Sequence, residues 1–216
     1  MGVCQDSRKT TPGDLFLAWQ GDSLDAHDFV GAAACNGAVA AVVERKVDIQ
    51  IPQIIVTDGR RSAALVACEV IGAGSRSMFT VGVTGTNGKT TTALLARYLM
   101  GQKGSTASIG TLGVFDEQDV RPGTEGLTTP GPVQVAIFLR QLVDGGMEAV
   151  VMEASSHALD QHRVDGVIFD IGVFTNLSHD HLDYHGDINE YFGAKARLVE
   201  LVSSQGTLVV NGDDPA

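Results

Sequence analysis

A phosphate-binding loop is predicted at residues 83–90, which read Val-Thr-Gly-Thr-Asn-Gly-Lys-Thr. The apolar residues 78–83 suit a buried strand, and the residues from Thr90 onward have helical spacing. Such a helix directs its N-terminal amides and partial positive charge at phosphate oxygens. Lys89 is in register to reach the β- and γ-phosphates, and the Thr90 hydroxyl to ligate Mg²⁺. The match to G-x-x-x-x-G-K-[ST] is incomplete, because Val83 stands where that pattern has its first glycine.

A carboxylate follows a second apolar segment, with Glu153 directly after residues 148–152. Functional groups of open α/β sheets gather at the carboxyl ends of strands, so Glu153 would face the phosphate loop and bind its Mg²⁺. A carboxylate that only caps the next turn is the alternative. The nearby phosphate loop favours the functional interpretation.

Residues 178–185 form a second polar cluster, with three histidines and two aspartates after the predicted strand 167–174. These side chains can ligate a metal or move protons. A zinc site is conceivable, although no cysteine and no H-E-x-x-H pattern supports one. A solvated loop with incidental histidines is the alternative interpretation.

Two further cations stand out. Gln161-His162-Arg163 is a polar segment in which the arginine can grip a phosphate or carboxylate with two hydrogen bonds, or can simply lie at the surface. Lys195 is surrounded by small and apolar residues, and its spacing alone indicates a helix lysine that extends to solvent.

The composition is that of a globular protein, with 44% hydrophobic and 19% charged residues among 216. The net charge of −11 argues against non-specific nucleic-acid or membrane binding, so local cations and amides must hold any phosphorylated ligand. The cysteines at 4, 35 and 68 lack metal-like spacing and fit reduced thiols. Neither a signal peptide nor a membrane-spanning run is evident. We therefore expect a cytoplasmic protein with no nucleic-acid or membrane partner.

The elements that must position these residues form two predicted units. The first, residues 1–77, contains strands at 14–18, 38–43 and 54–56 and helices at 27–37 and 62–71. The second, residues 78–216, contains strands at 78–83, 148–152, 167–174 and 207–210 and helices from 90, at 133–142 and at 189–202. The fold class is α/β: a small N-terminal α/β domain, then a P-loop-type parallel sheet with helices on both faces. Residues 72–77 have the composition of a linker. Residues 211–216 resemble a loop about to enter another helix, which indicates a sheet incomplete at its C-terminus.

Taken together, the motifs resemble the Mur ligase family of peptidoglycan synthesis, and within it the MurE group. The segments that carry the resemblance are Asp6-Ser7-Arg8, Gly13-Asp14-Leu15-Phe16, TGTNGKTTT at 84–92, Leu127-Thr128-Thr129-Pro130, MEASSHALDQHRV at 152–164, FTNLSHDHLDYHG at 174–186, and Lys195. They span essentially the whole chain. Family members are more than twice as long and have three domains, so the resemblance implies an N-terminal fragment that carries the UDP-sugar and ATP-phosphate half and is inactive alone.

The resemblance also implies roles for single residues. ATP phosphates would be bound by Thr84, Gly85, Thr86, Asn87, Gly88, Lys89 and Thr90. The substrate would be bound by Ser7 and Ser23 at its uridine end and by Thr128, Thr129, Ser155, Gln161 and Arg163 at its muramoyl-peptide and pyrophosphate. Magnesium would be bound by Thr90, Glu153, His181 and Lys195, the lysine after CO₂ converts it to a carbamate. Lys89, Lys195 and His181 would be the catalytic residues.

The implied reaction is ATP-dependent ligation of a third amino acid, meso-diaminopimelate or L-lysine, to UDP-MurNAc-L-Ala-D-Glu through an acyl phosphate. The full-length enzyme would be monomeric. Sister ligases of the same type remain alternatives, as does a non-catalytic module that binds nucleotide or UDP-sugar, or one subunit of a split ligase.

Overall fold

The computed structural model describes residues 2–21, 23–72, 78–116, 120–121 and 126–214. A first, wholly parallel sheet has the order β1-β2-β3-β4. Its strands are β1 (Val3–Cys4), β2 (Leu15–Leu17), β3 (Ala40–Val43) and β4 (Gln53–Ile55). The helices of this unit are the 3-10 helices η1 (Ser7–Lys9) and η2 (Ala26–Phe29), then α1 (Val30–Cys35) and α2 (Gly59–Ile71).

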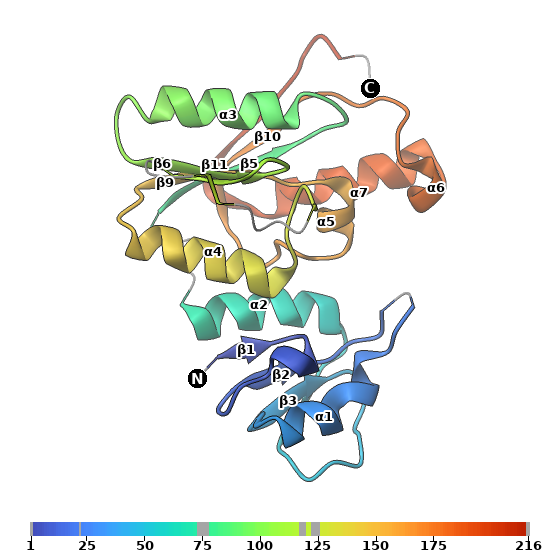
Figure 1. Ribbon diagram of the computed structural model, residues 1–216. Helices are drawn as coiled ribbons and strands as arrows, with labels where there is room; N and C mark the ends of the chain where they lie inside the picture. Colours follow the sequence, from blue (N-terminus) through green and yellow to red (C-terminus); the bar gives the residue numbers. More distant parts are fainter. Residues whose placement is uncertain (1, 22, 73–77, 117–119, 122–125, 215–216) are drawn as a thin grey trace.

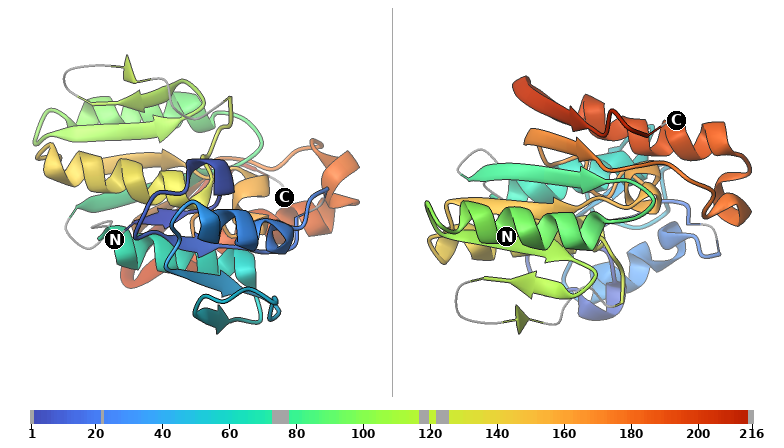
Figure 2. Two further views of the ribbon diagram at one scale, coloured as in Figure 1. Left: turned by 60° about the horizontal axis from the view of Figure 1, so that its bottom comes forward. Right: turned by 90° about the horizontal axis from the view of Figure 1, so that it is seen from above.

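The second sheet has the order β11-β10-β5-β9-β6-β7-β8. Its strands are β5 (Phe79–Thr84), β6 (Thr106–Gly110), β7 (Gly113–Phe115), β8 (Val120–Arg121), β9 (Ala149–Glu153), β10 (Phe169–Phe174) and β11 (Val202–Val210). Pairing is parallel from β11 through β6 and antiparallel for β7 and β8. β11 and β8 therefore form its two edges (Figure 2).

Helices cover both faces of this second sheet (Figure 1). α3 (Lys89–Met100) covers one face, and α4 (Pro132–Asp144), α5 (Ser156–Asp160) and α7 (Ile188–Glu200) cover the other, while the short α6 (Leu182–His185) precedes α7. α2 lies between the first sheet and α4, and its Ala63 and Ala67 belong to one buried apolar cluster with side chains of both units. Small residues on α2 thus let the two units pack closely.

The predicted α/β architecture with a largely parallel second sheet and helices on both faces is confirmed. Sequence patterns did not indicate β1, β6, β7, β8, α5 or α6, which are short or rich in small and polar residues. The helix predicted at 27–37 is a 3-10 turn followed by α1, and the strand predicted at 207–210 begins at Val202. Residues 73–77 of the predicted linker lie outside the described residues; Gly72 ends α2 in the left-handed region, with φ 66°.

Candidate functional site

The loop between β5 and α3 has the backbone of a phosphate cradle. Gly88 caps α3 with φ 82°, and Gly85 has φ 138°, a conformation that favours glycine. A Cβ atom on Gly85 would lie 1.9 Å from the Thr175 hydroxyl, so the site has no room for a side chain. The α3 N-terminus has no side-chain cap, which leaves its amides available to an anion.

The segment after β10 holds this loop in place. Asn176 accepts a hydrogen bond from the Asn87 amide through its side chain (2.9 Å) and one from the Thr86 amide through its carbonyl (2.9 Å). The Thr175 hydroxyl donates to the Asn87 carbonyl at 2.6 Å, and the Ser178 amide donates to the Thr86 hydroxyl at 2.9 Å. These residues stand in the FTNLSH segment at the carboxyl end of the strand beside β5. Their contacts fix the conformation of the loop between β5 and α3.

Two lysines converge on the loop. Lys89 Nζ donates to the carbonyls of Gly85 (3.0 Å) and Thr86 (2.8 Å), and Lys195 Nζ donates to Gly85 at 2.7 Å. Lys195 is only 1% exposed, and its ammonium lies 4.4 Å from the centre of the Tyr191 ring. The expectation from spacing alone, a lysine that extends to solvent, is therefore wrong. α7 directs this side chain inward against the phosphate loop.

Burial lowers the pKa of Lys195 to about 7, with the positive charge of Lys89 adding to the effect and Asp180 opposing it. Burial also lowers the pKa of Lys89, against the opposing charges of Glu153 and Asp180. A substantial fraction of Lys195 is therefore a neutral, nucleophilic amine near neutral pH.

Lys195 makes folding stability depend on pH in a defined direction. Its ordinary pKa of 10.5 applies in the unfolded chain, so the unfolded state binds more protons between pH 7 and 10.5. The free energy of unfolding of the wild type should rise with pH across that window relative to Lys195→Met, which has no such titration. Urea unfolding of both proteins in CO₂-free buffers measures this difference. A pH-independent difference would contradict the lowered pKa.

Glu153 ends β9 directly beside the loop and is 2% exposed. Its carboxylate accepts hydrogen bonds from the Thr90 hydroxyl at 2.9 Å and the Thr111 amide at 2.9 Å, and the Thr111 hydroxyl lies 3.1 Å from that of Thr128. Thr111 was missed because it follows β6, a strand that the sequence pattern did not reveal. The hydroxyl and carboxylate oxygens of Thr90 and Glu153 are hard donors of the kind that Mg²⁺ prefers. Among the described residues, no group of three His, Cys, Asp or Glu side chains is placed to hold a metal ion.

A second group of predicted residues meets around Thr129, which is fully buried. The Thr129 hydroxyl donates to the Glu153 carbonyl at 2.8 Å and accepts from the Ser155 amide at 3.0 Å. Arg163 donates to the Thr129 carbonyl at 2.9 Å and to the Gln161 side chain at 2.6 Å and 3.0 Å. Thr129 therefore connects Glu153, which lies beside the loop at 84–90, with Arg163 and its partner Gln161.

A cavity of about 270 Å³ opens in front of Gln161 and Arg163. Its other lining residues are Gln5, Trp19, Arg60, Leu127, Gly131 and Pro132, so both structural units contribute. Burial lowers the pKa of Arg163 from the high value that is usual for arginine. A partly desolvated guanidinium at a cavity wall is suited to an anionic ligand.

Within the polar cluster 178–185, Ser178 contacts the Thr86 hydroxyl and the Tyr184 hydroxyl accepts a hydrogen bond from Gln161 at 3.1 Å, whereas His181 takes part in neither contact. His181 precedes α6 with φ 52°, is about half exposed, and packs edge-on against His157 with ring centres 4.8 Å apart. No described contact joins it to Thr90 or Glu153. Burial, together with the charges of His181 and His185, lowers the pKa of His157. Ser7 is buried in η1 and Ser23 is exposed; neither lines the 270 Å³ cavity.

Comparison with known proteins decides the family. Residues 83–216 match the Mur ligase middle domain, and residues 1–78 match the Mur ligase family catalytic domain. The chain belongs to the Mur ligase family. A curated relative from Geobacillus thermodenitrificans, named UDP-N-acetylmuramoyl-L-alanyl-D-glutamate--2,6-diaminopimelate ligase, is 41% identical over 217 residues. That alignment covers 97% of this chain and 44% of the relative, so the chain spans less than half the length of this Mur ligase.

Solved Mur ligase structures have the same fold. A UDP-N-acetylmuramoyl-L-alanyl-D-glutamate--2,6-diaminopimelate ligase superimposes with a TM-score of 0.85 at 32% identity, covering 99% of this chain and 43% of that one. A MurF ligase from Thermotoga maritima in complex with ADP gives a TM-score of 0.69 at 26% identity, covering 99% and 46%. The MurE-type relative is thus the more similar of these two in both sequence and structure.

Two further observations bear on the sequence predictions. No helix in the described ranges is long and apolar enough to cross a membrane. Cys4, Cys35 and Cys68 are free thiols, as expected from their spacing.

Proposed function

We propose that this protein is an ATP-dependent ligase of the MurE type, which joins diaminopimelate to UDP-MurNAc-L-Ala-D-Glu. The observation that carries the proposal is the junction at Thr129, which contacts Glu153 on the phosphate side and Arg163 on the cavity side. This junction would hold the acceptor carboxylate next to the ATP phosphates. Diaminopimelate is proposed because the 41% and 32% identical relatives carry it in their names.

The two structural units would bind different substrates. Residues 1–77 would form the UDP-sugar-binding domain, with Ser7 and Ser23 toward the uridine, and residues 78–216 the ATP-binding domain. The loop at 84–90 would bind the ATP phosphates. The acceptor would be bound by Thr128, Thr129, Ser155, Gln161 and Arg163.

Magnesium fits the oxygen donors of Thr90 and Glu153, because Mg²⁺ in such sites is held by one or two carboxylates together with substrate phosphates and water. Bound there, it would neutralise charge on the transferring phosphoryl group. We propose that His181 and Lys195, the latter as a carbamate, are further ligands of Mg²⁺. The neutral amine of Lys195 can attack CO₂: an N–C bond forms, one C=O π bond of CO₂ breaks with its electron pair moving to oxygen, and the nitrogen releases a proton, which yields a carbamate anion. ¹³C NMR of the protein in labelled bicarbonate would show a carbamate signal that is lost in Lys195→Arg.

The proposed reaction has two steps. The D-Glu carboxylate attacks the γ-phosphorus, a new P–O bond forms, and the bond to the β-phosphate oxygen breaks as ADP leaves. Lys89 and the loop amides would stabilise the charge that spreads over the phosphoryl oxygens. The amino group of the incoming amino acid then attacks the acyl carbon, an amide forms, and phosphate leaves together with a proton from the amine. The acyl phosphate replaces a poor leaving group with a good one.

Binding measurements on the 216-residue chain test the substrate assignment. Calorimetry should show saturable binding of UDP-MurNAc-L-Ala-D-Glu in the presence of Mg-ADP, and weaker binding of UDP-MurNAc-L-Ala, which lacks the D-Glu carboxylate. A preference for UDP-MurNAc-tripeptide would instead identify a MurF-type sister ligase. Binding of nucleotide without any of these acceptors would favour a non-catalytic nucleotide-binding module.

A further inference from the structure

The loop that carries Gln161 and Arg163 has an unusual backbone between them. His162 has φ 57°, and His162 and His181 are the two non-glycine residues with positive φ in the part of the chain that the structure describes. Residues with a side chain rarely adopt a positive φ, so the backbone of His162 is strained. Such strain persists only where surrounding contacts fix it. The contacts around His162 therefore hold the loop in this conformation.

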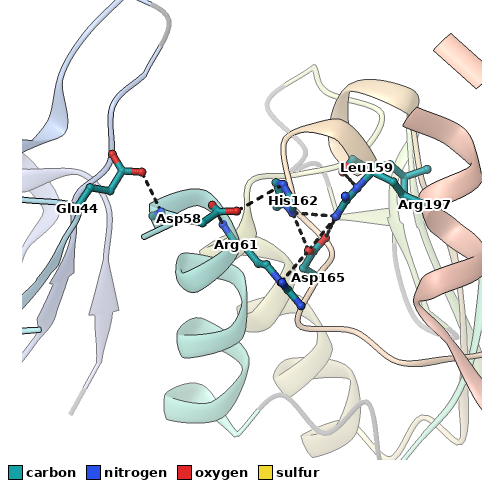
Figure 3. Close-up of polar contacts among 8 residues, drawn as sticks. Glu44, Asp58, Arg61, Leu159, His162, Asp165 and Arg197 are labelled. Carbon is teal, nitrogen blue, oxygen red and sulfur yellow. Dashed lines mark hydrogen bonds and ion pairs between the residues drawn. The ribbon is translucent and has the colours of Figure 1, made fainter. Parts of the chain in front are cut away.

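Asp165 is the centre of those contacts (Figure 3). Its side chain is 4% exposed and faces basic side chains from three segments. His162 Nδ1 lies 2.7 Å from Asp165 Oδ2, Arg197 Nη2 of α7 lies 3.1 Å from the same oxygen, and Arg61 Nε of α2 lies 3.7 Å from it. One buried carboxylate thus joins α2, the loop after α5, and α7.

The chemistry of the neighbours defines how His162 is held. Arg197 Nη2 lies 2.9 Å from Nδ1, but a guanidinium only donates and a carboxylate only accepts, so Nδ1 can serve one of them at a time. The Arg197–Asp165 ion pair favours an Nδ1–H that donates to Asp165. Arg197 Nε also donates to the Leu159 carbonyl at 3.0 Å, which secures the last turn of α5.

The same cluster reaches the first structural unit. Asp58 caps the N-terminus of α2, and its Oδ2 lies 3.8 Å from His162 Nε2. Glu44, just after β3, accepts a hydrogen bond from the Gly59 amide at 2.9 Å (Figure 3). The loop is therefore supported by both units that line the 270 Å³ cavity.

We propose that Asp165, together with His162 and Arg197, positions Gln161 and Arg163 for the acceptor substrate. Gln161 and Arg163 flank the strained residue, so rotation of the His162 backbone would turn both side chains away from Thr129 and the cavity. None of the three positioning residues lines that cavity, so they act through the loop. The acceptor assignment in this inference rests on the proposed function; the ordering of the loop does not.

Asp165→Asn tests the inference, because asparagine retains the shape of the side chain and one acceptor oxygen but loses the charge. We expect the Kd for UDP-MurNAc-L-Ala-D-Glu to rise about 10-fold or more, because a misplaced Arg163 would lose its charge-assisted hydrogen bonds to the substrate. The Kd for Mg-ADP, measured on the same samples, should stay within about twofold. If a folded Asp165→Asn variant lost affinity for both ligands equally, or for neither, the inference would be overturned.

Hydrogen exchange provides a readout that needs no ligand. The amides of His162, Arg163 and Asp165 donate to the carbonyls of Leu159, Ala158 and His162. Asp165→Asn should accelerate exchange at these amides selectively. Asp144→Asn, which removes the exposed ion pair with Arg140 on α4, is the matched control and should leave both exchange and affinity unchanged.

A second variant covers the case in which Asp165→Asn does not fold. His162→Gly accepts the positive φ without strain and should fold, but it loses the ring contact with Asp165. It should also weaken acceptor binding and accelerate loop exchange. If amide exchange in the loop stayed unchanged in every variant that folds, the positioning role would be overturned. If exchange in the loop accelerated but the wild-type protein bound no UDP-MurNAc-L-Ala-D-Glu, only the proposed substrate would be contradicted.

Discussion

Replacing Lys89 by methionine is expected to weaken nucleotide binding and to slow the phosphoryl transfer that depends on it. Lys89 Nζ donates to two carbonyls of the loop, so its ammonium already lies at the position that the phosphates would approach. Hydrogen bonds to charged groups contribute about 1.5–3 kcal/mol. The Kd for Mg-ADP should therefore rise about 10- to 100-fold. Turnover should fall further, by about 100-fold or more, because the charge on the phosphoryl group peaks in the transition state.

Lys103→Met is the control for this experiment, since Lys103 is exposed beyond the end of α3 and distant in sequence from the loop. It changes the net charge by the same amount. Equal losses of ADP affinity in both variants would indicate an effect of overall charge and contradict the assignment of Lys89. Circular dichroism would verify that both proteins keep their secondary structure.

Replacing Glu153 by glutamine is expected to reduce the dependence of nucleotide binding on Mg²⁺. Glutamine preserves the size of the side chain and one acceptor oxygen for Thr90 or Thr111, but it removes the negative charge beside the loop. In the wild type, Mg²⁺ should lower the Kd for ADP. In Glu153→Gln the ratio of the Kd without Mg²⁺ to the Kd with Mg²⁺ should be smaller by about 10-fold or more, because a buried charged partner of the metal is lost. Titration of each protein with ADP, once in the presence of Mg²⁺ and once in the presence of EDTA, measures this ratio.

Glu148→Gln provides a matched control, because Glu148 precedes the same strand that Glu153 ends. It lies at the opposite end of β9 and is exposed. The control should retain the full Mg²⁺ effect. If Glu153→Gln also retained it, the proposed magnesium site would have to be placed elsewhere.

The sequence was most informative about the strands β5, β9 and β10, whose carboxyl ends are followed by the candidate functional residues. β5, β9 and β10 are apolar strands of ordinary length, so the pattern located them within two residues of their observed limits. Since parallel neighbours end at one edge of the sheet, the loop after β5 and Glu153 could be expected to meet there. Asn176 could have been flagged by the same argument, because it follows β10.

Other features depend on tertiary contacts that local patterns do not encode. β6 reads Thr-Ala-Ser-Ile-Gly, and its strand character comes from pairing with β9, so the role of Thr111 was not visible. The burial of Lys195 depends on the face of α7 that packs on β5 and the loop. The cluster around Asp165 joins segments more than 90 residues apart in sequence, from Arg61 to Arg197.

The most direct test of the central claim is a phosphate-release assay on the protein purified from its natural source. We expect release from Mg-ATP that requires both UDP-MurNAc-L-Ala-D-Glu and diaminopimelate, with formation of the UDP-MurNAc-tripeptide. Release that is independent of the UDP-sugar peptide, or that requires a different acceptor, would contradict the assignment of Gln161 and Arg163 to this substrate and with it the proposed function.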